Sequence, residues 1–275
     1  MTFDILLTFY RAGAGLLYLG VAAAVALAGV MFAASHFGEV RRTFTWGHWI
    51  VAGGTLAVQF LVSAAAVVLL VAEAIKPATA VLVFSNWLVV LMALAAYPLG
   101  VWLEDRHRAN EERKPGELAA ILGWTVLILV WSFGSMLTIN AFVEVKEAAN
   151  LSELLMSPVA LLAFLPIALL APFVEEILFR LGVQGVLEEG CRRVGISPMA
   201  AIIVTSLLFA FGHAGMVTPD GAKELQIFGV GLILGWLKWR HGFRACVAGH
   251  MGLNLTSVVL QVLLFVFPES FTTGV

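Results

Sequence analysis

The sequence predicts an all-α protein, a polytopic membrane bundle of about eight transmembrane helices. Three observations support this fold class. Of the 275 residues, 61% are hydrophobic and 12% are charged, whereas soluble domains average about 45–50% apolar and about 25% charged residues. The apolar residues form long uncharged runs, and about 20 such residues span the core of a bilayer as a helix. The runs also lack the period-two alternation of a membrane β-barrel. Helices are therefore expected, because they satisfy the hydrogen bonds of their own backbone within lipid.

Eight uncharged windows are the candidate spans. In chain order they are Ala12–Ala34, Trp49–Ala72, Pro77–Leu103, Leu118–Val143, Leu154–Val174, Pro198–Val217, Leu225–Leu237 and Ala245–Phe267. The seventh window is the shortest and reaches only about 20 Å at about 1.5 Å per residue. Within it, Gly231 and Gly235 form a small-xxx-small pair that suits close packing between helices. We divide the chain into N-terminal spans at residues 1–150 and a C-terminal core at residues 151–275, which holds the clusters of polar residues described below.

Lys and Arg residues are distributed unevenly between the connecting segments. Eleven of them follow the first, third, fifth and seventh windows, and four lie on the other side, with Arg180 set aside. The positive-inside rule therefore predicts that both termini face away from the cytoplasm.

The net charge of -2 provides no basic surface for binding nucleic acid. Cys191 and Cys246 do not make a disulfide framework, and we interpret both as small buried hydrophobic residues.

The first cluster of ionisable residues is the sequence Glu175-Glu176-Ile-Leu-Phe-Arg180, directly after the fifth window. Ionisable residues within spans are costly, so they indicate function. On a helix, Glu176 and Arg180 are four residues apart and can form an ion pair, whereas Glu175 projects from another face. The spacing predicts one neutralised carboxylate and one that is free to act as a general base. Pro172 can bend the helix ahead of this pair and open space for water. The plainer alternative is an ordinary interfacial end of a span.

Two further clusters place polar side chains four residues apart on apolar helices. Phe209 and His213 share a face near the end of the sixth window, and His250 and Asn254 share a face in the eighth. The plainer alternatives are an interfacial histidine and a hydrogen bond between helices. For the three clusters to meet within the membrane, the helix of the first must continue to about Glu188. We interpret the remaining histidines as solvated: His36, His48, His107 and His241.

Together the three clusters resemble the motifs of the CPBP family of CAAX proteases and bacteriocin-processing membrane proteins, also called the type II CAAX prenyl endopeptidase or Abi family. The family motifs EExxxR, FxxxH and HxxxN read here EEILFR at Glu175–Arg180, FAFGH at Phe209–His213 and HMGLN at His250–Asn254. The resemblance covers about residues 155–267. It implies an intramembrane endopeptidase in the cytoplasmic membrane of a bacterium or archaeon, with a peptide or lipidated protein, delivered among the membrane lipids, as its substrate.

The resemblance also implies a set of site residues, namely Glu175, Glu176, Arg180, His213, His250 and Asn254, supported by Phe209 and Pro172. In that site Glu175 would activate water with the help of His213, and the pair Glu176 and Arg180 would orient the site. The polar pair of the eighth window would polarise the scissile carbonyl and stabilise the oxyanion, because donors aimed at developing negative charge act most strongly where water is scarce.

The sequence leaves alternatives on two points: whether the site needs a metal, and which class of function it serves. Glu175, His213 and His250 could hold a zinc ion and leave a position for water. The sequence has no HExxH motif, so we expect chemistry without a cofactor. The competing functions are a non-catalytic binding or bacteriocin-immunity protein and a transporter with a proton relay. The polar residues cluster in one half of the chain, which counts against the inverted repeats of a transporter.

Overall fold

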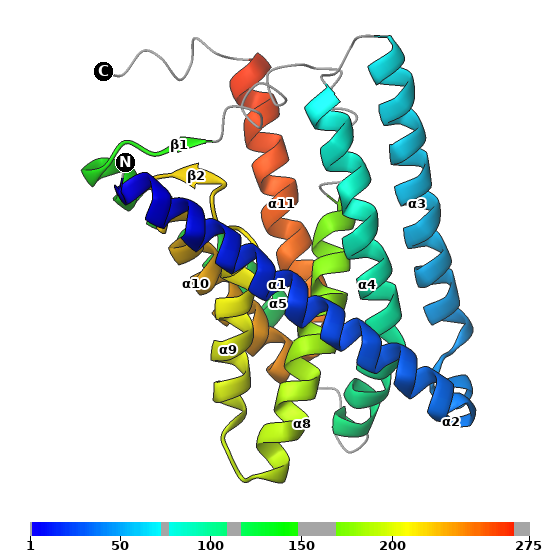
Figure 1. The fold of residues 1–275 in the computed structure, drawn as a ribbon. Helices are drawn as coiled ribbons and strands as arrows, with labels where there is room; N and C mark the ends of the chain where they lie inside the picture. The colour runs from blue at the N-terminus through cyan, green and yellow to red at the C-terminus, as the bar shows by residue number, and fades with distance from the viewer. Residues whose placement is uncertain (1, 73–76, 109–116, 148–168, 267–275) are drawn as a thin grey trace.

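The computed structural model describes residues 2–72, 77–108, 117–147 and 169–266, and most of these are helical (Figure 1). The N-terminal half holds α1 (Thr2–Ser35), α2 (Phe37–Thr43), α3 (Trp46–Val71), α4 (Pro77–Arg108) and α5 (Glu117–Phe142). The C-terminal half holds helical residues 169–176, η1 (Ile177–Gln184), α8 (Gly185–Arg193), α9 (Pro198–Phe211), α10 (Ala222–His241) and α11 (Phe243–Val266). The predicted all-α class is confirmed. A small antiparallel pairing of β1 (Lys146–Glu147) with β2 (Val217–Thr218) was not predicted.

Four helices are long and apolar enough to cross a membrane. They are α1, α3, α4 and α5, through the segments Leu6–Ser35, Trp46–Val71, Val83–His107 and Leu118–Phe142. Among the described residues, α9 is a shorter apolar helix, and α10 and α11 coincide with the seventh and eighth windows. Most of the fifth window lies outside the described residues. These apolar helices support an integral membrane protein, and the total of about eight spans stays a prediction.

The boundary of the sixth window is wrong. It was predicted to reach Val217, but α9 ends at Phe211 and Val217 belongs to β2. Between them the chain makes a turn through Gly212 and Gly215, and Gly215 has a φ of 78°, which glycine adopts without steric cost. The apolar composition of this stretch continues past the helix, so hydropathy alone does not mark where the helix ends.

Helix α1 crosses the bundle obliquely, whereas α3, α4 and α11 run close to a common direction (Figure 1). Its 34 residues extend about 51 Å at 1.5 Å per residue, which exceeds the bilayer core of about 30 Å. A tilt accommodates this excess length. The far end of α1 and the ends of α4 and α8 lie at the same end of the bundle in Figure 1. We call this the basic end, because α2 and the ends of these and the neighbouring helices carry Arg41, Arg42, Arg106, Arg192, Arg193, Arg240 and Arg244.

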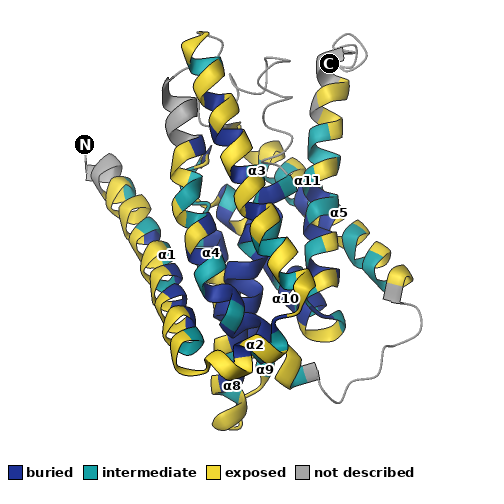
Figure 2. Ribbon diagram, turned by 90° about the vertical axis from the view of Figure 1, so that its right-hand side faces the viewer, coloured by how far each residue is buried: buried dark blue, intermediate teal, exposed yellow. Residues whose placement is uncertain are grey.

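The main hydrophobic core lies where η1 packs against α1 and α4. It contains fully buried residues of α4, such as Val90 and Ala96, and of η1, such as Ile177 and Leu178. Figure 2 shows buried residues at the centre of the bundle and exposed ones along the outer face of α1. Many of the exposed residues are large and apolar, as Leu16 is at 72% exposure, which suits a surface that faces lipid rather than water.

Glycines allow α10 to approach α9 closely. A Cβ atom at Gly235 would lie 2.8 Å from Cγ2 of Ile202, and one at Gly231 would lie 3.0 Å from Cβ of Ser206. Contacts this short exclude any larger residue unless the helices separate. The predicted role of Gly231 and Gly235 in close helix packing is confirmed.

Gly100 of α4 gives a sharper test of this packing, because it faces the backbone of η1. A Cβ atom there would lie 2.5 Å from Cβ of Leu181 and 3.0 Å from its carbonyl carbon. We expect Gly100→Ala to lower the free energy of unfolding by about 1–3 kcal/mol through overpacking, measured by denaturant titration in detergent micelles. At Gly53 of α3 nothing lies within 4 Å of the added carbon, so Gly53→Ala should be neutral or stabilising by up to about 1 kcal/mol. An equal loss in both variants would contradict the packing argument.

Candidate active site

The helix that carries Glu175 continues well beyond the fifth window, as the predicted meeting of the three clusters requires. Helical residues 169–176, with the buried Pro172 among them, run into η1 and then into α8, which ends at Arg193. The middle part, Ile177–Gln184, is a π-helix in which every residue is buried. No feature of the sequence predicted it. Such wide turns occur often at functional sites, and this one begins directly after the paired carboxylates.

Glu176 is held by three side chains. Its Oε2 accepts a hydrogen bond from Nε of Arg180 at 3.0 Å and contacts Sγ of Cys246 at 2.7 Å, while its Oε1 lies 2.8 Å from Nδ1 of His250. The side chains of Glu176 and Arg180 are both 0% exposed. The predicted ion pair is therefore present and fully buried. The contacts with Cys246 and His250 also fasten η1 to α11.

Arg180 carries unsatisfied donors in this buried position. Both Nη1 and Nη2 lack a hydrogen-bond partner among the described residues. The guanidinium lies 5.1 Å from the centre of the Phe209 ring, a distance at which a cation is attracted to an aromatic face. Phe209 thereby links the first cluster to the second.

Glu175 has different surroundings from its neighbour. Its side chain is 25% exposed, and its Oε2 lies 3.9 Å from Nε2 of His250. That separation is too long for a direct hydrogen bond, and one water beside the two atoms would be within reach of both. The two adjacent carboxylates thus differ as the spacing predicted: Glu176 is neutralised by an arginine, and Glu175 is accessible.

Phe209 also connects the two histidines of the site. Its ring centre lies 4.9 Å from that of His213 and 6.0 Å from that of His250, in edge-to-face geometry. His213 lies in the turn that follows α9, not within the helix as predicted. Its Nδ1 is 2.9 Å from the carbonyl oxygen of Phe209. Because a carbonyl only accepts, Nδ1 carries the proton and Nε2 offers a lone pair. Asn254, partly buried, lies one turn beyond His250 on α11.

The turn that bears His213 is fastened to α1. Arg11 forms a bidentate ion pair with Asp220, through Nε at 2.8 Å and Nη2 at 2.6 Å. The hydroxyl of Tyr10 donates to Glu224 at 3.2 Å, and Glu224 also accepts from the backbone N–H of Gly221 at 2.9 Å. The pairing of β1 with β2 holds the same segment from another side. Sequence reasoning missed this anchor, because no local pattern relates Arg11 to Asp220.

Cys246 is a second residue that sequence reasoning did not assign to the site. It is buried, as predicted, but its thiol contacts Glu176. The signal that could have found it is its position four residues before His250, which places both side chains on one face of α11. Cys191 lies apart, near the end of α8, and is only partly buried, so its predicted burial is wrong.

The interpretation of the remaining histidines as solvated is only partly right. His36 is exposed, but His48, His107 and His241 are each partly buried. Nε2 of His107 lies 3.3 Å from Glu189. Hydrogen bonds from Arg192 and Arg193 lower the pKa of Glu189 to about 2, so this carboxylate is ionised near neutral pH. These histidines belong to the basic end and not to the candidate site.

The possible zinc ligands do not form a ligand set. Within the described parts of the chain, no group of three or more His, Cys, Asp or Glu side chains is placed to hold a metal ion. Nδ1 of His213 is engaged with a backbone carbonyl, and Nδ1 of His250 with Glu176. These contacts leave Nε2 of both histidines as the possible ligand atoms, so chemistry without a metal stays a prediction.

Comparison with known families adds one match. Residues 157–256 match the family model of type II CAAX prenyl endopeptidase Rce1-like proteins. This range contains all three clusters, from Glu175 to Asn254. No curated protein matches the chain, and no solved structure does.

Proposed function

Since residues 157–256 belong to the Rce1-like family of CAAX prenyl endopeptidases, we propose that this protein is an intramembrane endopeptidase that uses glutamate-activated water. Its substrate would be a peptide or lipidated protein of CAAX type that arrives through the membrane. The single observation that carries the mechanism is the contrast between the two adjacent carboxylates. Glu176 is buried and fully engaged, whereas Glu175 is accessible and has no hydrogen-bond partner within 3.5 Å among the described residues.

In this mechanism Glu175 is the general base. A water between Glu175 and His250 would donate one hydrogen to the carboxylate and the other to Nε2 of His250, because the two acceptors are 3.9 Å apart. Glu175 would remove a proton as the water oxygen attacks the scissile carbonyl carbon. The same proton would then pass to the leaving nitrogen as the C–N bond breaks. Nε2 of His213 is also an acceptor, so it would be the alternative partner for the second hydrogen of this water.

The tautomer of His250 alters one role that the resemblance implied. Nδ1 faces the carboxylate of Glu176, so in the neutral ring Nδ1 carries the proton and Nε2 is an acceptor. An acceptor nitrogen can take a hydrogen bond from water, but it has no hydrogen to donate to an oxyanion. We therefore propose that His250 orients the water and that the amide of Asn254 supplies the donor for the oxyanion. The ion pair with Arg180 would fix the carboxylate of Glu176, and that carboxylate would in turn fix the ring of His250.

No metal takes part in this scheme. The described side chains do not gather a zinc ligand set, and each step uses a proton acceptor or donor of the chain itself. Cleavage that stops on chelation and returns with added zinc would contradict the scheme.

The first test compares protein termini in membranes from cells that carry the wild-type protein or the Glu175→Gln variant. New termini that need the wild-type protein would establish a peptidase and identify its substrate. Glu144→Gln is the matched control, because Glu144 is an exposed carboxylate that pairs only with Lys146 among the described residues. Identical termini in all samples, with a deletion phenotype still rescued by Glu175→Gln, would instead support a binding or immunity protein.

A further inference from the structure

Helix α1 places a tyrosine beside the candidate active site, although α1 lies outside the matched range of residues 157–256. Tyr18 projects from the buried side of this helix, because Ala14 and Ala22, four residues before and after it, are 6% and 0% exposed. The oblique course of α1 (Figure 1) brings this side against η1 and α9. The mechanism above gives α1 no part in the chemistry.

Two neighbours hold the ring of Tyr18 in place. Its centre lies 5.3 Å from that of the Phe179 ring, and Phe179 is four residues after Glu175, so both project from the same side of their helix. On the other side, a Cβ atom at Gly212 would overlap Cδ2 and Cε2 of the Tyr18 ring. Gly212 directly precedes His213. The ring of Tyr18 therefore lies between the two segments that carry Glu175 and His213.

The hydroxyl of Tyr18 has no hydrogen-bond partner among the residues that the structure describes. Glu175 is the charged residue whose field acts on this phenol. An O–H dipole beside an anion turns its hydrogen toward the charge, and the attraction is strong where water is scarce. Glu175 therefore has two polar neighbours: Nε2 of His250 at 3.9 Å on the side of α11, and the hydroxyl of Tyr18 on the side of α1. Glu175 and Tyr18 are both only partly buried, so one substrate can contact them together.

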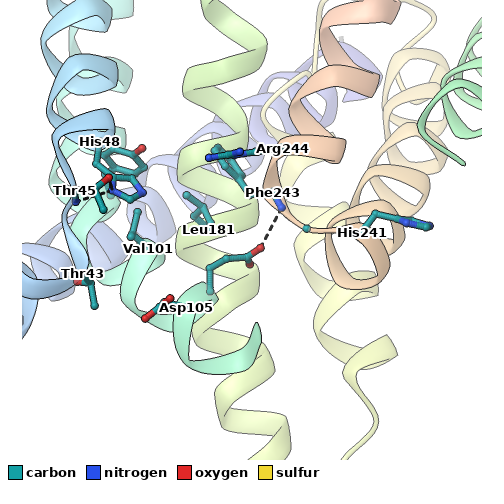
Figure 3. Close-up of a pocket in the computed structure, with 12 residues that line it drawn as sticks. Thr43, Thr45, His48, Val101, Asp105, Leu181, His241, Phe243 and Arg244 are labelled. Carbon is teal, nitrogen blue, oxygen red and sulfur yellow. Dashed lines mark hydrogen bonds between the residues drawn. The ribbon is translucent and has the colours of Figure 1, made fainter. Parts of the chain in front are cut away.

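The other two of the three tyrosines have different surroundings. The hydroxyl of Tyr10 donates to Glu224 at 3.2 Å. Tyr97 lines a pocket of about 440 Å³ toward the basic end, where His48 and Arg244 also belong to the walls (Figure 3). Glu175 does not line that pocket. Among the tyrosines, Tyr18 therefore combines an unpaired hydroxyl with a place beside the reacting carboxylate.

We propose that Tyr18 is a further catalytic residue, whose hydroxyl donates a hydrogen bond to the scissile carbonyl oxygen as that oxygen becomes an oxyanion. Asn254 would donate to the same oxygen from α11. This inference rests on the proposed endopeptidase function. No bond to Tyr18 forms or breaks, and its proton stays on the phenol.

The movement of charge during the reaction explains why a donor without a partner suits this place. Before the attack, the negative charge is on Glu175. When Glu175 takes a proton from the water and the water oxygen attacks, the charge passes to the carbonyl oxygen of the substrate. The hydroxyl of Tyr18 can follow this charge without first breaking a hydrogen bond of its own, and such preorganised donors stabilise a transition state most. A direct hydrogen bond from Tyr18 to Glu175 would instead weaken Glu175 as a base.

The test is Tyr18→Phe in the full-length protein, which removes one oxygen and keeps the ring against Phe179. With the peptide that the terminal analysis identifies, we expect kcat to fall by about 10²-fold to 10³-fold, the effect of removing one oxyanion donor. KM should change little, because the bond forms only in the transition state, and thermal unfolding should be unchanged. Tyr10→Phe makes the same change on the same helix and should lower kcat far less, because the ion pair of Arg11 with Asp220 still fastens the turn.

Three results would overturn the role of Tyr18. If Tyr18→Phe keeps the wild-type kcat while Tyr18→Leu loses activity and stability together, the ring only packs. If Tyr18→Phe moves the pH–rate profile without lowering the maximal kcat, the hydroxyl acts on Glu175 and not on the oxyanion. If Tyr10→Phe lowers kcat as much as Tyr18→Phe does, the effect belongs to α1 as a whole.

A measurement without substrate separates this inference from the proposed function. Tyrosine labelled with ¹³C at Cζ gives one NMR signal for each of the three tyrosines, assigned by the Tyr→Phe variants. Glu175→Gln should move the signal of Tyr18, and the control Glu144→Gln should not. If the wild type cleaves its peptide but neither the signal nor kcat responds, Tyr18 has no role and the peptidase stands. If the signal moves but no peptide is cleaved, Tyr18 does face Glu175, and the endopeptidase function is wrong together with the catalytic role of Tyr18.

Discussion

Replacing Arg180 with methionine should lower the free energy of unfolding by about 3–5 kcal/mol, because it leaves the buried Glu176 carboxylate without its counter-charge. Both side chains are 0% exposed, so water cannot take over the lost interaction. Unfolding by denaturant in mixed micelles, followed by circular dichroism, measures the loss. The double variant Glu176→Gln, Arg180→Met should recover part of the stability, since no unpaired charge remains.

The control for this effect is Arg193→Met at the basic end. Arg193 also pairs with a glutamate at four-residue spacing, through Nε at 2.8 Å from Glu189, but its side chain is 69% exposed. An exposed pair of this kind contributes about 0–1 kcal/mol. A loss in Arg180→Met no larger than that of Arg193→Met would mean that the buried pair does not stabilise the core as described.

The second large effect is the loss of activity in Glu175→Gln. Removing a general base should reduce kcat by about 10²-fold to 10⁴-fold, with the free energy of unfolding changed by less than about 1 kcal/mol. Glu175 is partly exposed and has only a long contact with His250, so glutamine fits without breaking an ion pair. Purified protein in nanodiscs, with a fluorogenic version of the identified peptide, gives kcat, and thermal unfolding gives stability.

Glu176→Gln makes the same chemical change one residue later and should behave differently. It leaves Arg180 buried without an ionised partner and weakens the contact with His250, so stability and activity should fall together. If Glu175→Gln destabilises the protein as much as Glu176→Gln does, the division between a reacting and a positioning carboxylate is wrong.

Hydrophobic patterning predicted most helices because lipid permits few other structures. Windows two to four match α3, α4 and α5 closely, and the seventh and eighth match α10 and α11. Helix α1 ends with the first window but begins ten residues before it, at Thr2. The failure at the end of α9 has a physical cause. Residues from Gly212 to Met216 form a turn, but His213 is their only polar residue and none is charged like Lys, Arg, Asp or Glu. A hydropathy window cannot distinguish a turn from a helix in such a stretch.

The site was predictable as far as its contacts are local. Glu176 and Arg180 are four residues apart on one helical segment, so spacing alone brings this pair together. Phe209 and His213 are also four residues apart and in contact, although His213 lies in the turn after α9. The contacts that assemble these pairs are long-range: His250 with Glu176, and Arg180 over Phe209. Spacing along one helix carries no information on these, and the family resemblance supplied the expectation that they meet. No pattern of residue types predicted the π-helix of η1.

The ion pair between Arg11 and Asp220 has a consequence for the order in which the protein is made. The two residues are 209 positions apart, so the turn that carries His213 cannot dock on α1 until ribosomal synthesis has passed Asp220. His250 is made later still, and Glu176 lacks its contact with α11 until then. Pairings between distant segments form slowly because the intervening chain must first be ordered. A nascent chain interrupted before α11 therefore holds Glu175 and Glu176 without His250 and cannot form the complete candidate site.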